Sequence, residues 1–144
     1  MSLQFKAVDN SQIPFFKRIL KENNLPYRDI NEKKMNLFLI YDDSGFIGTV
    51  GCEKFQEVAL LRSLVVIEEV RNKGYGGKIC TKILNMLGAS GVREVYLLTT
   101  TVPEFFHSQG FVVVSRDIVP EIIKATGEFS GLCPKSAICM GIKI

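Results

Sequence analysis

The segment Val58–Ile67 has the sequence V-A-L-L-R-S-L-V-V-I, in which only Arg62 and Ser63 interrupt an apolar run. Such a run is typical of a central strand whose two faces are both covered. The glycine-rich stretch R-N-K-G-Y-G-G follows at residues 71–77, and the residues up to Ala89 place apolar side chains along one face of a helix. This order predicts an α/β domain, or α+β in some classification schemes. The apolar face of the helix consists of Tyr75, Ile79, Ile83, Met86 and Leu87.

The rest of the chain supplies strands and helices that belong to the same unit. No repeat, low-complexity stretch or linker divides the 144 residues, so we expect a single domain over residues 1–144. The turn Asp42–Gly45 predicts a hairpin, and a strand, a helix and a strand between residues 92 and 115 predict a parallel crossover. Residues 27–36 fit either a loop or a second short helix. Strand patterns occupy residues 3–8, 37–41, 46–55, 92–98, 111–115 and 137–144; helical patterns follow a cap at Asn10 or Ser11 and occupy residues 102–109 and 121–125.

Charge and composition exclude several classes of function. The net charge of +3 comes from scattered residues, without the basic face that nucleic-acid binding needs. The N-terminus lacks a signal-peptide pattern, and no apolar run approaches the ~20 residues of a membrane helix, so we expect a cytoplasmic protein that binds neither nucleic acid nor membrane. The four cysteines lack the spacing of a zinc site, which predicts free thiols and no metal. The oligomeric state stays open, and a dimer is one option if residues 137–144 form a sheet edge.

Residues 71–77 have the composition of an anion-binding turn. Glycines let successive backbone N–H groups point into one concavity, and the N-terminus of the following helix adds roughly half a positive charge. Arg71 and Lys73 add charge at the rim. A Walker A loop needs Ser or Thr where Ile79 stands, and Ile79 also replaces the third glycine of a dinucleotide fingerprint, so both motifs are excluded. The alternative is that the glycines only let the helix pack closely on the strand.

The motif R-N-K-G-Y-G resembles the R/Q-x-x-G-x-G/A signature of the GCN5-related N-acetyltransferase (GNAT) superfamily, and the order of elements is similar to that fold over essentially the whole chain. The stretch F-F-H-S-Q-G-F at residues 105–111 resembles the short helix of that family that ends in Gly-Phe. The resemblance implies a mixed, mostly antiparallel sheet flanked by helices, with central parallel strands that splay apart around Val66 and Thr99. It also implies that acetyl-CoA is a co-substrate whose pantetheine arm lies in the gap.

The same resemblance assigns roles to individual positions. Val66 would supply a main-chain N–H that stabilises the oxyanion formed during acetyl transfer, on a strand that carries a bulge. The coenzyme would be bound by Leu64, Val65, Val66, Arg71, Asn72, Lys73, Gly74, Tyr75, Gly76, Gly77, Thr99 and Phe106.

The chain departs from the family pattern at the proton donor. The family usually has a Tyr four residues before the Gly-Phe step, and Phe106 stands there, which cannot donate a proton. His107, the sole histidine, is a tentative substitute unless it faces solvent, and the thiolate could also leave without a dedicated acid. Candidates for a general base are Glu53, Glu69 and Glu104, each of which could equally be a surface carboxylate.

The polar residues Arg62 and Ser63 of the central strand are tentative acceptor-binding groups, because polar groups in an apolar strand need partners. The Arg62 guanidinium could bind an acceptor carboxylate through two hydrogen bonds, or form a buried ion pair with a neighbouring carboxylate. Cys133 is a third tentative contact, since thiols suit trivalent arsenic, although Cys133 and Cys139 could also be small core residues.

A narrower resemblance over roughly residues 97–140 is to acetyltransferases encoded with arsenic-resistance genes and, more loosely, to the acetyltransferase domain of N-acetylglutamate synthases. It implies a small acceptor, such as an amino acid or an arsenic-bearing analogue. We therefore expect an acyltransferase, an N-acetyltransferase that acts by direct transfer in a ternary complex. A non-catalytic acetyl-CoA sensor is the alternative, and transfer to a protein amine is disfavoured because residues 116–134 would cover a small substrate.

Overall fold

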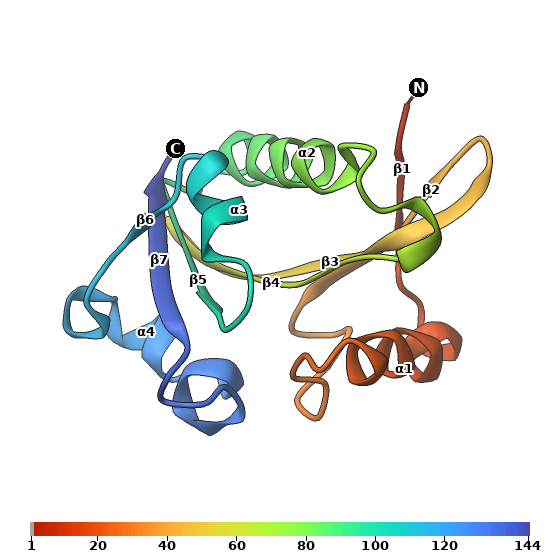
Figure 1. Ribbon diagram of the computed structural model, residues 1–144. Helices are drawn as coiled ribbons and strands as arrows, with labels where there is room; N and C mark the ends of the chain where they lie inside the picture. The colour runs from red at the N-terminus through yellow and green to blue at the C-terminus, as the bar shows by residue number, and fades with distance from the viewer. Residues whose placement is uncertain (1) are drawn as a thin grey trace.

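The computed structural model describes residues 2–144, which form one seven-stranded sheet flanked by helices (Figure 1). The strand order is β1-β2-β3-β4-β5-β7-β6. The strands are β1 (Gln4–Ala7), β2 (Asn36–Asp42), β3 (Gly45–Phe55), β4 (Val58–Val66), β5 (Glu94–Thr99), β6 (Val112–Val113) and β7 (Ile138–Lys143). The helices are α1 (Ile13–Glu22), α2 (Tyr75–Ala89), α3 (Pro103–Ser108) and α4 (Glu121–Lys124), with helical turns η1 (Asn10–Gln12), η2 (Glu68–Val70), η3 (Arg116–Ile118) and η4 (Glu128–Leu132).

The two faces of the sheet carry different numbers of apolar cores. In Figure 1, α2 and α3 lie on one side of the sheet, and α1 and α4 lie on the other. The face under α2 and α3 carries one large apolar core, to which α2 contributes Ile79 and Ile83. The opposite face carries two separate cores, one around Phe16 of α1 and one around Ile123 of α4. A region between these two cores is therefore left for polar groups.

The centre of the sheet opens at the boundary between β4 and β5. These strands run parallel, and their paired register covers only Val58–Leu60 opposite Glu94–Tyr96. The other paired strands in the described chain are antiparallel. The predicted mixed, mostly antiparallel sheet with a splayed parallel pair is confirmed.

The first half of the chain departs from the expectations at three points. Asp9 caps the first helical turn instead of Asn10 or Ser11, because its N–H donates to Gln12 Oε1 at 3.0 Å in a capping box. Residues 27–35 form turns and contain no helix, and β2 begins at Asn36. On α2, Met86 is 38% exposed, and Cys80 is buried in the core instead.

The C-terminal strands are arranged differently from the simple crossover. β6 is only two residues long, and β7 lies between β5 and β6, antiparallel to both. β5 and β6 therefore run in the same direction, as predicted, but they are not neighbours, and β7 is not an edge strand. Within residues 2–144, no helix combines the length and the hydropathy that a membrane crossing requires.

Candidate functional site

A cleft with a volume of 1320 Å³ opens where β4 and β5 separate. The cleft is bordered by the loop after α1, the second half of β4, the N-terminus of α2, the end of β5, α3 and the turn η4. It therefore connects the glycine-rich turn at one end with the C-terminal segment at the other.

The second half of β4 carries a β-bulge at Ser63. Its pairing with β3 shifts register between Thr49 and Gly51, and Ser63 has a left-handed backbone with φ of 61°. The Thr49 hydroxyl donates to the Ser63 carbonyl at 2.8 Å, which fixes the bulge in place. At Gly48 a Cβ atom would lie 1.8 Å from the Val65 carbonyl oxygen, so only glycine lets β3 approach the bulged strand this closely.

Val66 presents its backbone N–H to the cleft. The next residue, Ile67, donates its N–H to Ile47 of β3 at 2.9 Å. Because the hydrogen-bonding groups of successive strand residues face opposite sides, the N–H and C=O of Val66 point away from β3. Consistent with this direction, Arg71 Nε donates to the Val66 carbonyl at 2.8 Å. The splay of β5 leaves the cleft on that side, so the amide predicted as the oxyanion donor faces it.

The glycine-rich turn directs backbone amides toward the same cleft. Asn72 and Gly74 adopt left-handed backbones with φ of 64° and 83°, and a Cβ on Gly74 would meet nothing within 4 Å, so its backbone angle is what favours glycine. Gly76 differs, because its Cβ would lie 3.2 Å from the Phe105 ring, so close packing explains it in part. Lys78 donates the first intrahelical bond of α2, to Gly74, so the amides of Gly76 and Gly77 have no acceptor within the helix.

Two side chains of the turn anchor it. Arg71 is exposed and, besides its bond to Val66, donates from Nη2 to Asn23 Oδ1 at 2.9 Å. The buried Tyr75 hydroxyl donates to Asp42, whose pKa is lowered to about 2 by hydrogen bonds from Ser44 and then from Tyr75. Tyr75 therefore ties the start of α2 to the β2–β3 hairpin.

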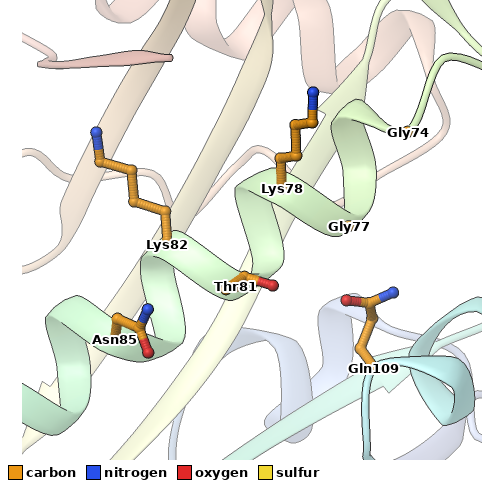
Figure 2. A pocket seen from close by; sticks show the side chains of 7 residues that line it. All are labelled: Gly74, Gly77, Lys78, Thr81, Lys82, Asn85 and Gln109. Atoms are coloured by element: carbon orange, nitrogen blue, oxygen red, sulfur yellow. The ribbon is translucent and has the colours of Figure 1, made fainter. Parts of the chain in front are cut away.

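An open recess continues the cleft along the exposed side of α2 (Figure 2). Gly74 and Gly77 line both spaces. In Figure 2, Lys78 and Lys82 project from one side of the helix, and Gln109 faces the helix from the neighbouring segment. The recess thus offers positive charge next to the amides of the turn.

Of the residues proposed around α3, some line the cleft and others lie outside it. Phe106 is buried and lines the cleft, where its ring packs against Phe111 with centroids 5.8 Å apart. Thr99 also lines the cleft, and its Oγ1 accepts from the Val102 N–H at 3.2 Å. His107 is exposed and is not among the cleft residues, because neighbouring positions on a helix point about 100° apart. We therefore do not retain His107 as the acid; Glu69 and Glu104 are likewise exposed and outside the cleft.

At the other end of the cleft, Arg62 is fully buried among three carboxylates. Its Nη1 lies 2.6 Å from Asp29 and 3.0 Å from Glu53, and its Nε lies 3.3 Å from Glu128. Its Nη2 donates to Asp29 and to the Pro26 carbonyl, and its Nε also donates to the Ser63 hydroxyl. Every guanidinium nitrogen already has acceptors, so Arg62 forms the buried ion pair and has no donor left for an acceptor carboxylate.

This group, hereafter the Arg62 cluster (Asp29, Glu53, Arg62 and Glu128), contains one cation and three carboxylates. Burial raises the pKa of Glu128 to about 7, and Arg62 only partly offsets that rise. Burial also raises the pKa of Glu53. Since one guanidinium cannot neutralise three carboxylates, the cluster has excess negative charge and favours one retained proton.

The cysteines of the C-terminal segment occupy different places. Cys133 lines the cleft, and burial followed by the charge of Glu128 raises the pKa of its thiol to about 12. Cys139 is buried in the core around Ile123. A thiol that is protonated to this degree is a weak metal ligand at neutral pH.

Sequence reasoning missed Glu128, Asp29 and Tyr27. Glu128 and Tyr27 line the cleft, and Asp29 pairs with Arg62. The only signal in the sequence was the unpaired polar character of Arg62, which predicted a carboxylate partner without identifying it. No group of His, Cys, Asp and Glu side chains in residues 2–144 is arranged to hold a metal ion.

Comparison with known proteins adds an independent finding. A model of the acetyltransferase (GNAT) domain family matches residues 33–113. The chain is 35% identical over 83 residues to an uncharacterized N-acetyltransferase of Chlorobaculum tepidum, a match that covers 58% of this chain and 51% of that protein. It is 28% identical over 98 residues to an amino-acid acetyltransferase of Pseudomonas syringae, covering 65% and 22% respectively. The chain thus spans 51% and 22% of the lengths of these relatives.

Solved structures share the fold at low identity. The N-acetylglutamate synthase of Neisseria gonorrhoeae, complexed with coenzyme A and N-acetyl-glutamate, matches with a TM-score of 0.79 and 17% identity, over 99% of this chain and 35% of that chain. Tetrahymena GCN5 matches with a TM-score of 0.72 and 16% identity, over 98% and 96%. These likenesses confirm the predicted fold.

Proposed function

This chain belongs to the acetyltransferase (GNAT) family, and we propose that it transfers the acetyl group of acetyl-CoA directly to the nitrogen of a small amine. The observation that carries the proposal is that the Val66 amide and the amides at the start of α2 face one cleft. One amide can stabilise developing negative charge, and the others can bind a pyrophosphate.

The coenzyme would be held mainly by the backbone. Its pyrophosphate fits the turn at the start of α2, with the amides of Gly76 and Gly77 and with Arg71 at the rim. Its pantetheine arm fits the gap between β4 and β5 beside Leu64 and Thr99. Lys78 and Lys82, which border the recess along α2, would lie near the adenosine phosphates.

The chemistry follows from positioning and charge. The Val66 N–H would stabilise the oxyanion, and holding the amine against the thioester can supply up to ~7–11 kcal/mol of the rate acceleration. Phe106 occupies the position where the family usually has a proton donor, so we infer that the departing thiolate takes a proton from the reacting nitrogen.

We expect a small acceptor, with an amino acid or an arsenic-bearing analogue as first candidates. The loop after α1 and the turn η4 both border the cleft, which limits the room beside the acetyl site. Lys21, in the last turn of α1, and Arg28, in the loop after it, line the cleft and could meet an acceptor carboxylate. Arg62 cannot do so, because its donors are already taken. The Pseudomonas syringae relative is an amino-acid acetyltransferase, which agrees with this class.

The test is coenzyme A thiol release over a panel of amino acids, polyamines, arsenic-bearing amino-acid analogues and short peptides, with calorimetry of coenzyme A binding. Val66→Pro removes the N–H without breaking a bond to β3, and we expect its kcat to fall by about 100- to 1000-fold while coenzyme A still binds. Val66→Ala keeps the amide and is the matched control. Coenzyme binding without turnover of any acceptor would instead identify a sensor.

A further inference from the structure

Glu128 is the one acidic side chain among the described residues that line the cleft. It comes from η4, within the C-terminal segment, and the whole residue is only 3% exposed. Lys21, Arg28, Arg62 and Arg71 are charged residues of the opposite sign on the same lining. Because the other charged residues of this lining are cations, Glu128 is the carboxylate available as a proton acceptor in the cleft.

The surroundings of Glu128 leave its charge only partly compensated. Arg62 of β4 approaches it at 3.3 Å but is also paired with Asp29, from the loop after α1, and with Glu53 of β3. Cys133, just after η4, hydrogen-bonds to it through its side chain. The charged or titratable groups that face Glu128 are therefore one cation, two carboxylates and a neutral thiol, so the pocket attracts a positively charged group.

The position of Glu128 fits proton transfer to or from the acetyl site. Arg62 Nε contacts both Glu128 and the Ser63 hydroxyl, at 3.3 Å and 3.2 Å, so these two oxygens lie on the same edge of the guanidinium. Ser63 precedes Val66 by three residues, and Ser63, Val66 and Glu128 all line the cleft. An acceptor amine and one bridging hydroxyl or water would lie between the oxyanion donor and the carboxylate.

We propose that Glu128 is the general base of the acetyl transfer and that its carboxylate, at the cleft face of the Arg62 cluster, receives the ammonium group of the acceptor. This assignment rests on the proposed function and makes it more specific, because it requires an acceptor that arrives as a cationic primary amine. Arg62 is a positioning residue that holds Glu128 in the cleft wall.

The proposed reaction releases one proton to solvent overall. The ammonium gives one proton to the Glu128 carboxylate, and the neutral amine forms the C–N bond with the thioester carbon. The C–S bond breaks with its electron pair on sulfur, and a second proton from the nitrogen converts the thiolate to the thiol. The proton held by Glu128 then passes to solvent, so the products are the N-acetyl amine, coenzyme A and one proton.

A purely structural role for the cluster predicts a different behaviour. In that case Glu128 would only fasten η4 to β4, and removing its charge would change stability without changing the pH dependence of turnover. The base role predicts that kcat/KM rises with pH as the cluster loses its proton, with an apparent pKa near 7, because burial raises the pKa of Glu128 to about that value.

The decisive variant is Glu128→Gln, which keeps the shape and removes the proton acceptor. With the best acceptor of the panel, we expect kcat/KM to fall by about 100-fold or more and its rise with pH to disappear. Coenzyme A affinity should stay within about twofold, since the coenzyme is held at the other end of the cleft. Glu128→Asp retains a carboxylate and should recover part of the activity together with the pH-dependent rise.

The matched control is Glu53→Gln, which removes the same charge from the same arginine outside the cleft lining. It should keep the pH-dependent rise and move it to lower pH, because the Glu53 charge helps raise the pKa of Glu128. Ser63→Ala tests the bridging hydroxyl, and a loss of about 10-fold or more assigns the bridge to Ser63 rather than to water.

The assignment is overturned if folded Glu128→Gln, checked by its thermal melting curve, keeps kcat/KM within threefold and an unchanged pH profile. It is also overturned if an amine analogue that stays uncharged at neutral pH is acetylated with the same kcat/KM as its cationic counterpart. Failure of the proposed function itself looks different, because the unmodified protein would then bind coenzyme A and acetylate no member of the panel.

Discussion

Arg62 and Arg71 stand on either side of the strand segment that carries Val66, and they serve opposite ends of the cleft. Arg62 is buried with every nitrogen bonded to side chains or carbonyls of three other segments. Arg71 is exposed and bonded to only the Val66 carbonyl and Asn23. The two residues have the same chemistry, yet one is committed to the fold and the other can still reach a ligand.

The difference extends to the two ends of the cleft. The end of the cleft proposed to hold the coenzyme, hereafter the coenzyme end, is built from backbone amides of one short segment, whose charge comes from a helix terminus and changes little with pH. The end proposed to hold the acceptor, hereafter the acceptor end, is built from buried ionisable side chains of distant segments, whose charge depends on pH. Substitutions at the acceptor end should therefore change mainly stability and pH dependence. Substitutions at the coenzyme end should change mainly ligand affinity.

The largest effect is expected from Arg62→Met. It leaves three buried carboxylates without their cation, which should lower the free energy of unfolding by about 3–5 kcal/mol at pH 7. Urea unfolding followed by circular dichroism measures it. Arg71→Met, at the exposed position, is the control and should stay within about 1 kcal/mol of the unmodified protein. Equal losses in the two variants would mean that the buried arginine contributes no more to stability than the exposed one.

The next effect concerns the pH dependence of stability. Because the pKa of Glu128 is raised to about 7 in the folded protein from 4.5, its contribution is fully present below pH 4.5 and is lost as pH rises through 7. The difference in unfolding free energy between the unmodified protein and Glu128→Gln should therefore change by about 3 kcal/mol between pH 4.5 and 8. Urea titrations at four pH values test this, and a difference that is constant with pH would contradict it.

A smaller effect is expected at the coenzyme end from Gly74→Ala. Its backbone φ of 83° disfavours any residue with a Cβ, so we expect a loss of about 1–2 kcal/mol of stability. Coenzyme A affinity, measured by calorimetry, should fall as well, because the amides of the turn are displaced. Gly88→Ala, in the last turn of α2, has room for its Cβ and should be neutral or slightly stabilising.

The smallest effect should come from Arg71→Ala. We expect coenzyme A affinity to fall about fivefold, or about 1 kcal/mol, with a weaker salt dependence, while the unfolding free energy hardly changes. Lys33→Ala removes an equal charge outside the cleft and should leave affinity unchanged. A similar loss in both variants would mean that overall charge, and not the place of Arg71, attracts the coenzyme.

The sequence predicts the coenzyme end well because its determinants are contiguous. The strand Val58–Val66, the turn at residues 71–77 and the helix Tyr75–Ala89 follow one another, so local patterns of apolarity, glycine and period predict them. The Val66 amide could not be inferred from its side chain, and its role came from the family resemblance. Its direction in the structure agrees with that role.

The acceptor end was predicted only in part because it is assembled from residues far apart in the chain. Arg62 needed a carboxylate partner on general grounds, but its hydrogen-bond partners include Asp29, 33 positions away. Glu128 lies in an irregular segment where no period shows which side chains turn inward. His107 lies outside the cleft for another reason: as the neighbour of Phe106 in sequence, it points to a different side of α3.

The bulge at Ser63 also changes which way β4 faces. Before it, Ala59 and Leu61 pack in the core beneath α2; after it, Leu64 and Val66 do so, and Val65 joins the core of α1. One extra residue thus reverses odd and even positions along β4, while β3 keeps an unbroken alternation with Thr49 opposite Val65 and Gly48 opposite Val66. Loss of a single codon there would straighten the strand and leave Val66 opposite Gly48, so the shape of the cleft wall would change and the direction of the amide would not.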